Sequence, residues 1–142
     1  TWYGLFTKEG NATQSIDVLN SCWGNNHRNR APIIHSFLLN NKDKKESVKI
    51  KRGKECIFTY EVADPDNDEL EFEFVLMPES TDKKSGGDFE KTPEPISLKI
   101  VEHSDNKIVI KPPSKSGPYR FFIYIRDNNK NVATANFPFY VK

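Results

Sequence analysis

The chain has 142 residues, of which 36% are hydrophobic, 29% charged and 12% aromatic, and its formal net charge is +1 at pH 7. This length suits one domain with a sizeable core, and ten phenylalanines favour a β-rich one. The near-neutral charge gives no global case for a nucleic-acid partner, and no apolar run is long enough for a membrane span. The start at Thr1 and the single Met predict a piece of a longer protein, with any export signal upstream.

The first 31 residues differ in pattern from the rest. Residues 2–6 are apolar and are expected to form a short strand or turn. Apolar residues then recur at helical spacing: Ala12, Ile16, Leu19 and Trp23. This spacing predicts one amphipathic helix, which is too short to be stable alone and must dock on a neighbouring surface. Residues 24–31 are polar and aperiodic, so we expect a linker that ends at Pro32.

From Ile33 onward the pattern changes to strands. The expected strands are 33–39, 48–51, 55–63, 69–76, 96–101, 107–110, 119–125 and 132–141. Several of them alternate apolar and polar residues with a period of two, which is typical of half-buried antiparallel strands. In 55–63 this places Cys56, Phe58, Tyr60 and Val62 on one face. In 69–76 it places Leu70, Phe72, Phe74 and Leu76 inward, and Glu69, Glu71 and Glu73 outward. The strand 119–125 is apolar on nearly every residue and is expected to lie centrally, covered on both faces. The sequence therefore predicts a mainly β chain, an immunoglobulin-like antiparallel β-sandwich of seven to eight strands with an N-terminal helical appendage.

Three local features carry their own expectations. Cys22 and Cys56 fall in a helix and a strand, so we expect two separate buried thiols and no disulfide. Tyr119 follows Gly-Pro at the start of a strand, which predicts a tyrosine corner whose hydroxyl bonds nearby backbone. The long polar stretch 77–95 is either functional or a disordered insertion, with Phe89 pinning it to the body.

Two stretches carry a family resemblance. They are Ala63-Asp64-Pro65-Asp66-Asn67-Asp68-Glu69-Leu70, and Gly117-Pro118-Tyr119 followed by Ile125-Arg126-Asp127-Asn128. Together they resemble a PKD-type (or fibronectin-III-like) immunoglobulin-like repeat, in which a D-P-D-x-D turn follows one strand. The resemblance covers about residues 32–142 and implies a fold rather than a function.

A second resemblance spans the whole chain. It rests on four stretches: 1–23, Asn29-Arg30-Ala31-Pro32, residues 78–82 and Ser85-Gly86-Gly87-Asp88. They resemble the C-terminal end of exported bacterial proteins of the glycoside hydrolase family 2 type. The resemblance implies that residues 1–31 are the last strand, helix and linker of a (β/α)8 barrel, and that 32–142 form the sandwich. It further implies a periplasmic, extracellular or cell-surface location, catalytic residues before Thr1, and the barrel as partner.

That resemblance also gives two aromatic residues a role. In a barrel enzyme the end of the last strand lies on the active-site side, so Trp2 and Tyr3 are candidate carbohydrate contacts. Packing within the barrel is the other interpretation of both residues.

One acidic turn is a candidate metal site. Asp64, Asp66 and Asp68 are spaced like oxygen ligands for Ca²⁺. A full site needs six to eight oxygens, and no EF-hand-type acid follows, so we favour a solvated turn in which the aspartates bond their own backbone. We therefore expect no metal and no other cofactor, with calcium as the alternative.

The charge distribution is uneven along the chain. Seven bases lie within residues 42–54 and seven acids within 61–73. Solvated strand faces of opposite sign are the favoured interpretation, and an anion- or polysaccharide-binding patch is the alternative.

No nucleophile, phosphate-loop or metal-ligand motif is evident, and His27, His35 and His103 are far apart. The leading hypothesis is a non-catalytic accessory module of an exported carbohydrate-degrading enzyme. The alternatives are a stand-alone glycan-binding module, with an aromatic row at Phe122, Tyr124 and Tyr140, and a calcium-stiffened adhesion repeat.

Overall fold

The computed structural model describes residues 4–24, 28–81 and 92–142. In chain order the elements are β1 (Ala12–Thr13), α1 (Gln14–Cys22), β2 (Ile33–Leu39), a 3₁₀ turn (Lys44–Glu46), β3 (Lys49–Ile50), β4 (Cys56–Ala63), β5 (Glu71–Pro78), β6 (Lys99–Ser104), β7 (Lys107–Lys111), β8 (Gly117–Arg126) and β9 (Asn131–Val141). The predicted immunoglobulin-like β-sandwich with one N-terminal helix is confirmed. All eight predicted strands are present within a few residues, and β1 is an additional short strand. No helix in these ranges has the length and hydropathy of a membrane span.

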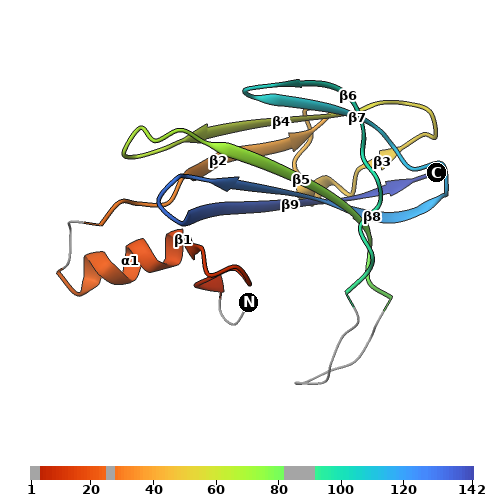
Figure 1. Cartoon of the computed structure of the whole chain (residues 1–142). Coiled ribbons are helices and arrows are strands. Elements are labelled where there is room, and N and C mark those ends of the chain that lie inside the picture. The colour runs from red at the N-terminus through yellow and green to blue at the C-terminus, as the bar shows by residue number, and fades with distance from the viewer. Residues whose placement is uncertain (1–3, 25–27, 82–91) are drawn as a thin grey trace. The chain divides into compact units, whose positions relative to one another are not determined.

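The strands form two sheets (Figure 1). One has the order β1-β9-β8-β5, with β3 also paired to β9, and the other has the order β2-β4-β7-β6. The short strands β1 and β3 pair in parallel with opposite ends of β9, at 131–132 and 140–141. Pro138 lies in the stretch of β9 between these two pairings.

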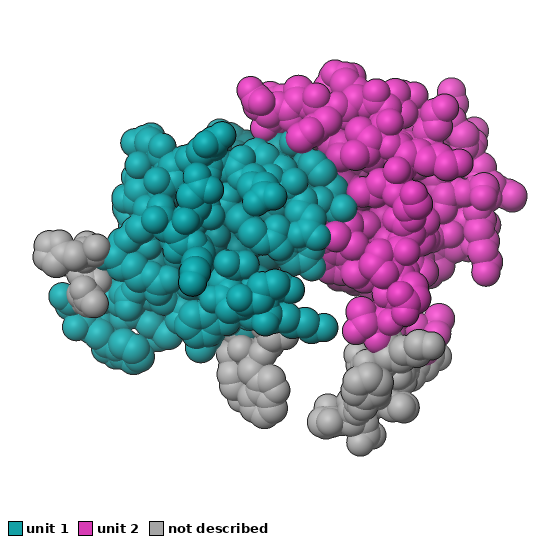
Figure 2. Space-filling view, in the orientation of Figure 1, with its two compact units in different colours: residues 1–37, 60–74, 123–135 teal, residues 38–59, 75–122, 136–142 magenta. Residues whose placement is uncertain are grey.

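The chain divides into two compact units (Figure 2). Unit 1 contains residues 1–37, 60–74 and 123–135. Unit 2 contains residues 38–59, 75–122 and 136–142.

The core of unit 2 is built around Phe58 of β4. Its side chain is fully buried, and its ring stacks on that of Phe121 with centroids 4.1 Å apart. The rings of Phe137 and Phe139 meet it edge-on, each at 6.1 Å. Phe58 belongs to one sheet and the other three rings to the other sheet. This aromatic cluster therefore joins the two layers of the sandwich within unit 2.

Unit 1 has a second aromatic cluster. Tyr60 of β4 lies 5.7 Å from Phe72 and 6.1 Å from Phe74, both on β5. Glu71 and Glu73, the alternate residues of β5, are exposed, so the inward and outward faces predicted for this strand are confirmed.

The prediction that the strand 119–125 is covered on both faces needs a correction. Alternate residues of β8 are buried, but the residues between them are only half-buried, so one face is less covered than expected.

The N-terminal helix is also confirmed, with a different start and less burial. Ala12 belongs to β1 rather than to the helix, and no residue of α1 is fully buried. Gly24 follows the helix with φ of +78°, the left-handed conformation expected of a glycine at this end. In Figure 1 the helix runs beside β1 and the start of β9, which are parts of the same unit.

The two cysteines behave differently from each other. Both are free thiols, as expected, but Cys22 is exposed and the prediction that it is buried is wrong. It lies in the last turn of α1, a helix in which no residue is fully buried. Cys56 is buried on β4, and burial raises the pKa of its thiol to about 12. It therefore acts as a small apolar core group.

Tyr119 forms the predicted tyrosine corner. Its hydroxyl donates a 2.8 Å hydrogen bond to the Lys115 carbonyl oxygen, and burial raises the pKa of the phenol. Residues 82–91, which include Phe89, lie outside the described residues.

Candidate functional site

Three carboxylates of unit 1 converge where two turns meet. Asp64 follows β4, Asp68 lies in the same β4–β5 turn, and Asp127 follows β8. One carboxylate oxygen from each lies within 4.8 Å of the others. We call Asp64, Asp68 and Asp127 the carboxylate cluster. Two oxygens bound to one Ca²⁺ at 2.3–2.6 Å can be at most about 5 Å apart, so this spacing is compatible with a shared ion.

Local hydrogen bonding explains how Asp64 is positioned. Its Oδ1 accepts hydrogen bonds from the backbone N–H groups of Asp66 at 2.9 Å and Asp68 at 3.0 Å. Asn67 between them has φ of +60°, which an asparagine tolerates better than most residues. The other oxygen, Oδ2 of Asp64, is buried and has no hydrogen-bond donor in the described residues. Among the described residues it is the one buried side-chain nitrogen or oxygen without a hydrogen-bond partner.

Asp127 is set by the second turn in a similar way. Its Oδ1 accepts from the backbone N–H groups of Asn129 at 2.8 Å and Asn131 at 2.9 Å. Its Oδ2 accepts a 2.7 Å hydrogen bond from the side-chain amide of Asn131. Asp127 is 7% exposed and Asn131 1%, so these bonds are largely shielded from water. They fix the conformation of the β8–β9 turn. The Asn129 side chain joins this turn to the β4–β5 turn by donating a 3.0 Å hydrogen bond to Asp68 Oδ2.

Residues 28–31, expected to be a linker, are hydrogen-bonded to this cluster. The Asn29 side chain donates to Asp68 Oδ2 and accepts a 2.8 Å bond from Asn131. Arg28 donates to the Asn131 side-chain oxygen at 2.8 Å. Side-chain amides thus donate to Asp68 and Asp127, while the Arg28 guanidinium bonds the Asn131 amide rather than a carboxylate. The segment is therefore a structural part of unit 1.

Asp66 does not join the cluster, which corrects the predicted set of Asp64, Asp66 and Asp68. Its Oδ2 accepts from the Arg30 backbone N–H at 2.7 Å, and its Oδ1 pairs with the Arg30 guanidinium at 3.2 Å. The backbone hydrogen bond, and then the side-chain one, lower the pKa of this exposed carboxyl. Asp127 takes its place in the cluster. Its position directly after a strand, within the motif Ile125-Arg126-Asp127-Asn128, was the available signal.

The remaining candidate residues and charged stretches lie outside the carboxylate cluster or outside the described residues. Trp2, Tyr3 and His27 lie outside the described residues. In the basic stretch, Lys42 pairs with Glu46 at 3.6 Å, and in the acidic stretch Glu73 pairs with Arg126 at 2.7 Å. These exposed pairs fit the interpretation of solvated strand faces.

The expected aromatic row is not presented openly. Phe122 and Tyr124 are half-buried, and the Arg126 guanidinium lies 5.7 Å from the Tyr124 ring centroid. Tyr140 is exposed.

No family model matches the sequence, and no curated protein matches it. Similar solved structures include PcoC, a methionine-rich copper resistance protein from Escherichia coli, with 18% identity, a TM-score of 0.45, and coverage of 79% of this chain and 99% of that one. Another is a nucleoside hydrolase-related hypothetical protein from Saccharophagus degradans that is associated with carbohydrate metabolism (18% identity, TM-score 0.47, 83% of this chain). A DUF4784 family protein from Bacteroides caccae is 12% identical, with a TM-score of 0.37 over 76% of this chain.

This chain spans 26% of the Saccharophagus protein and 24% of the Bacteroides protein. At these identities and TM-scores, we draw no functional argument from the similarities. The resemblance to glycoside hydrolase family 2 proteins stays a prediction.

Proposed function

We propose that this chain is a non-catalytic accessory module of an exported carbohydrate-degrading enzyme, in which it braces or spaces the catalytic barrel. The observation that carries the proposal is the exposure of two large apolar side chains at α1, Val18 within the helix and Trp23 directly after it. Trp23 is 78% exposed and Val18 58%. Exposed apolar side chains of this size contribute strongly to binding free energy when another protein surface covers them.

The helix is held on unit 1 by contacts in its first turn and in the residues that precede it. The Asp17 carboxylate accepts a 2.8 Å hydrogen bond from the Ala31 backbone N–H. Before the helix, the Ala12 backbone N–H donates to the Lys130 carbonyl oxygen at 2.8 Å. The Thr13 hydroxyl donates to the Leu5 carbonyl oxygen at 3.2 Å. A helix fixed in this way presents Trp23 to a partner domain at little further entropic cost.

The groups with altered pKa values support a non-catalytic role. The buried Cys56 thiol has its pKa raised to about 12, which suppresses the nucleophilic thiolate at neutral pH. The Tyr119 hydroxyl is engaged by backbone, and the Asp66 carboxylate by Arg30. Burial accounts for the raised pKa values of Cys56 and Tyr119, and hydrogen bonds from Arg30 account for the lowered pKa of Asp66.

Trp23→Ala tests this proposal. In a protein where the catalytic barrel precedes this chain, we expect the variant to weaken the barrel–module contact by about 2 kcal/mol, the scale of an interface hot spot. The melting temperature of the joined protein should fall. In the chain alone, the same substitution should change the free energy of unfolding by less than about 0.5 kcal/mol, because the side chain is exposed. Differential scanning calorimetry on both proteins measures the two effects.

Ile100→Ala is the matched control, since Ile100 is 52% exposed but lies on β6. This substitution should leave the melting temperatures of both proteins unchanged. Equal, small effects of Trp23→Ala in the two proteins would contradict the bracing role.

A calcium-stiffened module is the second candidate function. The buried Asp64 Oδ2, which has no donor among the described residues, supports it, as does the 4.8 Å convergence of the carboxylate cluster. The existing hydrogen bonds weigh against it, because Asp127 already accepts three. Asp64, Asp68 and Asp127 would hold the ion.

Thermal unfolding with Ca²⁺ tests this second candidate. A resident ion predicts that millimolar Ca²⁺ raises the melting temperature by several degrees, because binding to the folded state alone stabilises it. Asp64→Asn should abolish the rise, while Asp66→Asn, outside the cluster, should leave it intact. An unchanged melting temperature in the unmodified protein would exclude this candidate.

A further inference from the structure

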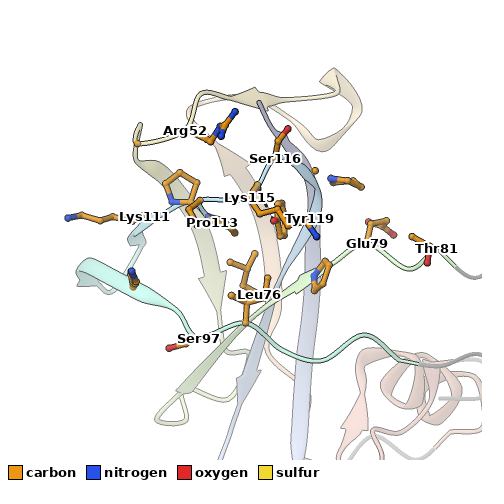
Figure 3. A pocket seen from close by; sticks show the side chains of 18 residues that line it. Arg52, Leu76, Glu79, Thr81, Ser97, Lys111, Pro113, Lys115, Ser116 and Tyr119 are labelled. Atoms are coloured by element: carbon orange, nitrogen blue, oxygen red, sulfur yellow. Dashed lines mark hydrogen bonds between the residues drawn. The ribbon is translucent and has the colours of Figure 1, made fainter.

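Unit 2 contains a groove that the proposed function does not use (Figure 3). Its volume is about 910 Å³, within the range of small-molecule binding sites. Four segments line it: the turn after β3, the end of β5, the residues that lead into β6, and the connection from β7 to β8.

The floor of the groove is apolar and held in place. Leu76 is 2% exposed and Tyr119 5%, and the rings of Pro78, Pro112, Pro113 and Pro118 also contribute. The Ile96 backbone N–H donates to the Leu76 carbonyl oxygen at 2.7 Å. The Glu79 backbone N–H donates to the Pro118 carbonyl oxygen at 3.0 Å. Fixed segments and proline rings lose little freedom when a ligand binds.

The rim of the groove is basic. Arg52, Lys99, Lys111 and Lys115 line it, against one carboxylate, that of Glu79. Glu79 is already neutralised, because its two oxygens accept hydrogen bonds from Arg120 Nε at 3.0 Å and from a terminal Arg120 nitrogen at 2.9 Å. Four positive charges are therefore uncompensated. In the part of the chain that the structure describes, none of the four cations forms an ion pair.

Two of the four cations lie apart from the carboxylate of Glu79. In Figure 3, Arg52 and Lys111 lie on the side of the groove away from Glu79 and Thr81. The whole chain has a net charge of only +1, so the groove concentrates positive charge well beyond the average. A cleft lined by one sign of charge raises the local concentration of oppositely charged ligands.

We propose that this groove binds an acidic oligosaccharide, a sugar chain that carries carboxylate or sulfate groups. The cations meet its anionic groups, and the hydroxyls of Ser97, Ser114 and Thr81 on the rim meet its hydroxyls. The apolar floor suits the C–H faces of pyranose rings. The preference for a sugar over other polyanions rests on the proposed function.

The mixture of cations and hydroxyls in the lining also favours a sugar over an acidic peptide. Ser and Thr hydroxyls both donate and accept hydrogen bonds, so they match a ligand that carries hydroxyl groups beside its anionic groups. Carboxylated and sulfated sugars carry both kinds of group, whereas the side chains of an acidic peptide carry only carboxylates.

Titration of the intact chain by NMR or calorimetry tests the inference. The probes are a galacturonate tetrasaccharide, a sulfated heparin-type tetrasaccharide and a neutral cello-oligosaccharide of the same length. We expect at least one acidic probe to bind, with affinity that falls as salt rises, and the neutral probe to bind at least tenfold more weakly. The two acidic arms distinguish carboxylate from sulfate as the recognised group.

The paired variant Arg52→Gln, Lys115→Gln should weaken binding of the acidic probe about tenfold. Lys44→Gln, Lys45→Gln is the matched control, since both lysines are exposed in the 3₁₀ turn and do not line the groove. Equal loss in both variants, or no binding of either acidic probe, would overturn the inference. Equally tight binding of a poly-glutamate peptide would overturn the assignment to sugars. None of these results bears on the Trp23→Ala experiment, so the proposed function is tested separately.

Discussion

Replacing Phe58 with alanine is expected to lower the free energy of unfolding by about 3–5 kcal/mol. The side chain is 0% exposed, and its ring contacts the rings of Phe121, Phe137 and Phe139. Removing it loses the burial of one ring and leaves a cavity between two sheets. Domains are stable by only about 5–15 kcal/mol in total, so this single change removes a large share. Urea unfolding followed by far-UV circular dichroism measures the difference.

Phe58→Leu separates loss of volume from loss of the aromatic contacts. Leucine fills most of the space, so this variant should lose much less stability, about 1–1.5 kcal/mol. A loss below about 1 kcal/mol for the alanine variant, with an unchanged slope against urea, would contradict the central position of this ring.

The sandwich and its faces were predictable because the evidence for a half-buried strand is local. In β4 and β5, alternate residues point to opposite sides, so the period of two alone assigns Phe58 and Tyr60 to the core and Glu71 and Glu73 to the surface. The tyrosine corner of Tyr119 was predictable for the same reason, since its partner Lys115 lies only four residues away.

The residues that make up the carboxylate cluster were harder to predict from the sequence. Spacing placed Asp64, Asp66 and Asp68 together, but Asp64 accepts the Asp66 backbone N–H, and the Asp66 side chain bonds Arg30 instead. Asp127 enters from a turn some 60 residues away, through a pairing of turns that no local pattern encodes. The exposure of Cys22 has a similar origin, because burial on a helix depends on what that helix meets.

Asp127→Ala should be the second most damaging of the predicted changes, with a loss of about 2–4 kcal/mol in the free energy of unfolding. The carboxylate accepts three hydrogen bonds, from the backbone N–H groups of Asn129 and Asn131 and from the Asn131 side chain. Asn131 is 1% exposed, so water cannot readily replace the lost acceptor. A buried donor left without a partner costs about 1–3 kcal/mol. Unfolding in urea with a chelator present measures this loss without any contribution from bound cations.

Two variants define what the carboxylate contributes. Asp127→Asn keeps an oxygen for the two backbone donors but turns an amide toward the Asn131 amide, donor against donor, so its loss should be intermediate. Asp105→Ala, in the exposed turn between β6 and β7, should change stability by less than about 0.5 kcal/mol. If Asp127→Ala were as mild as Asp105→Ala, the β8–β9 turn would not depend on this network. If Asp127→Asn were as severe as Asp127→Ala, the negative charge and the Oδ2 contact would matter more than the two backbone bonds. The attachment of residues 28–31 to the two turns would then depend mainly on the negative charge of Asp127.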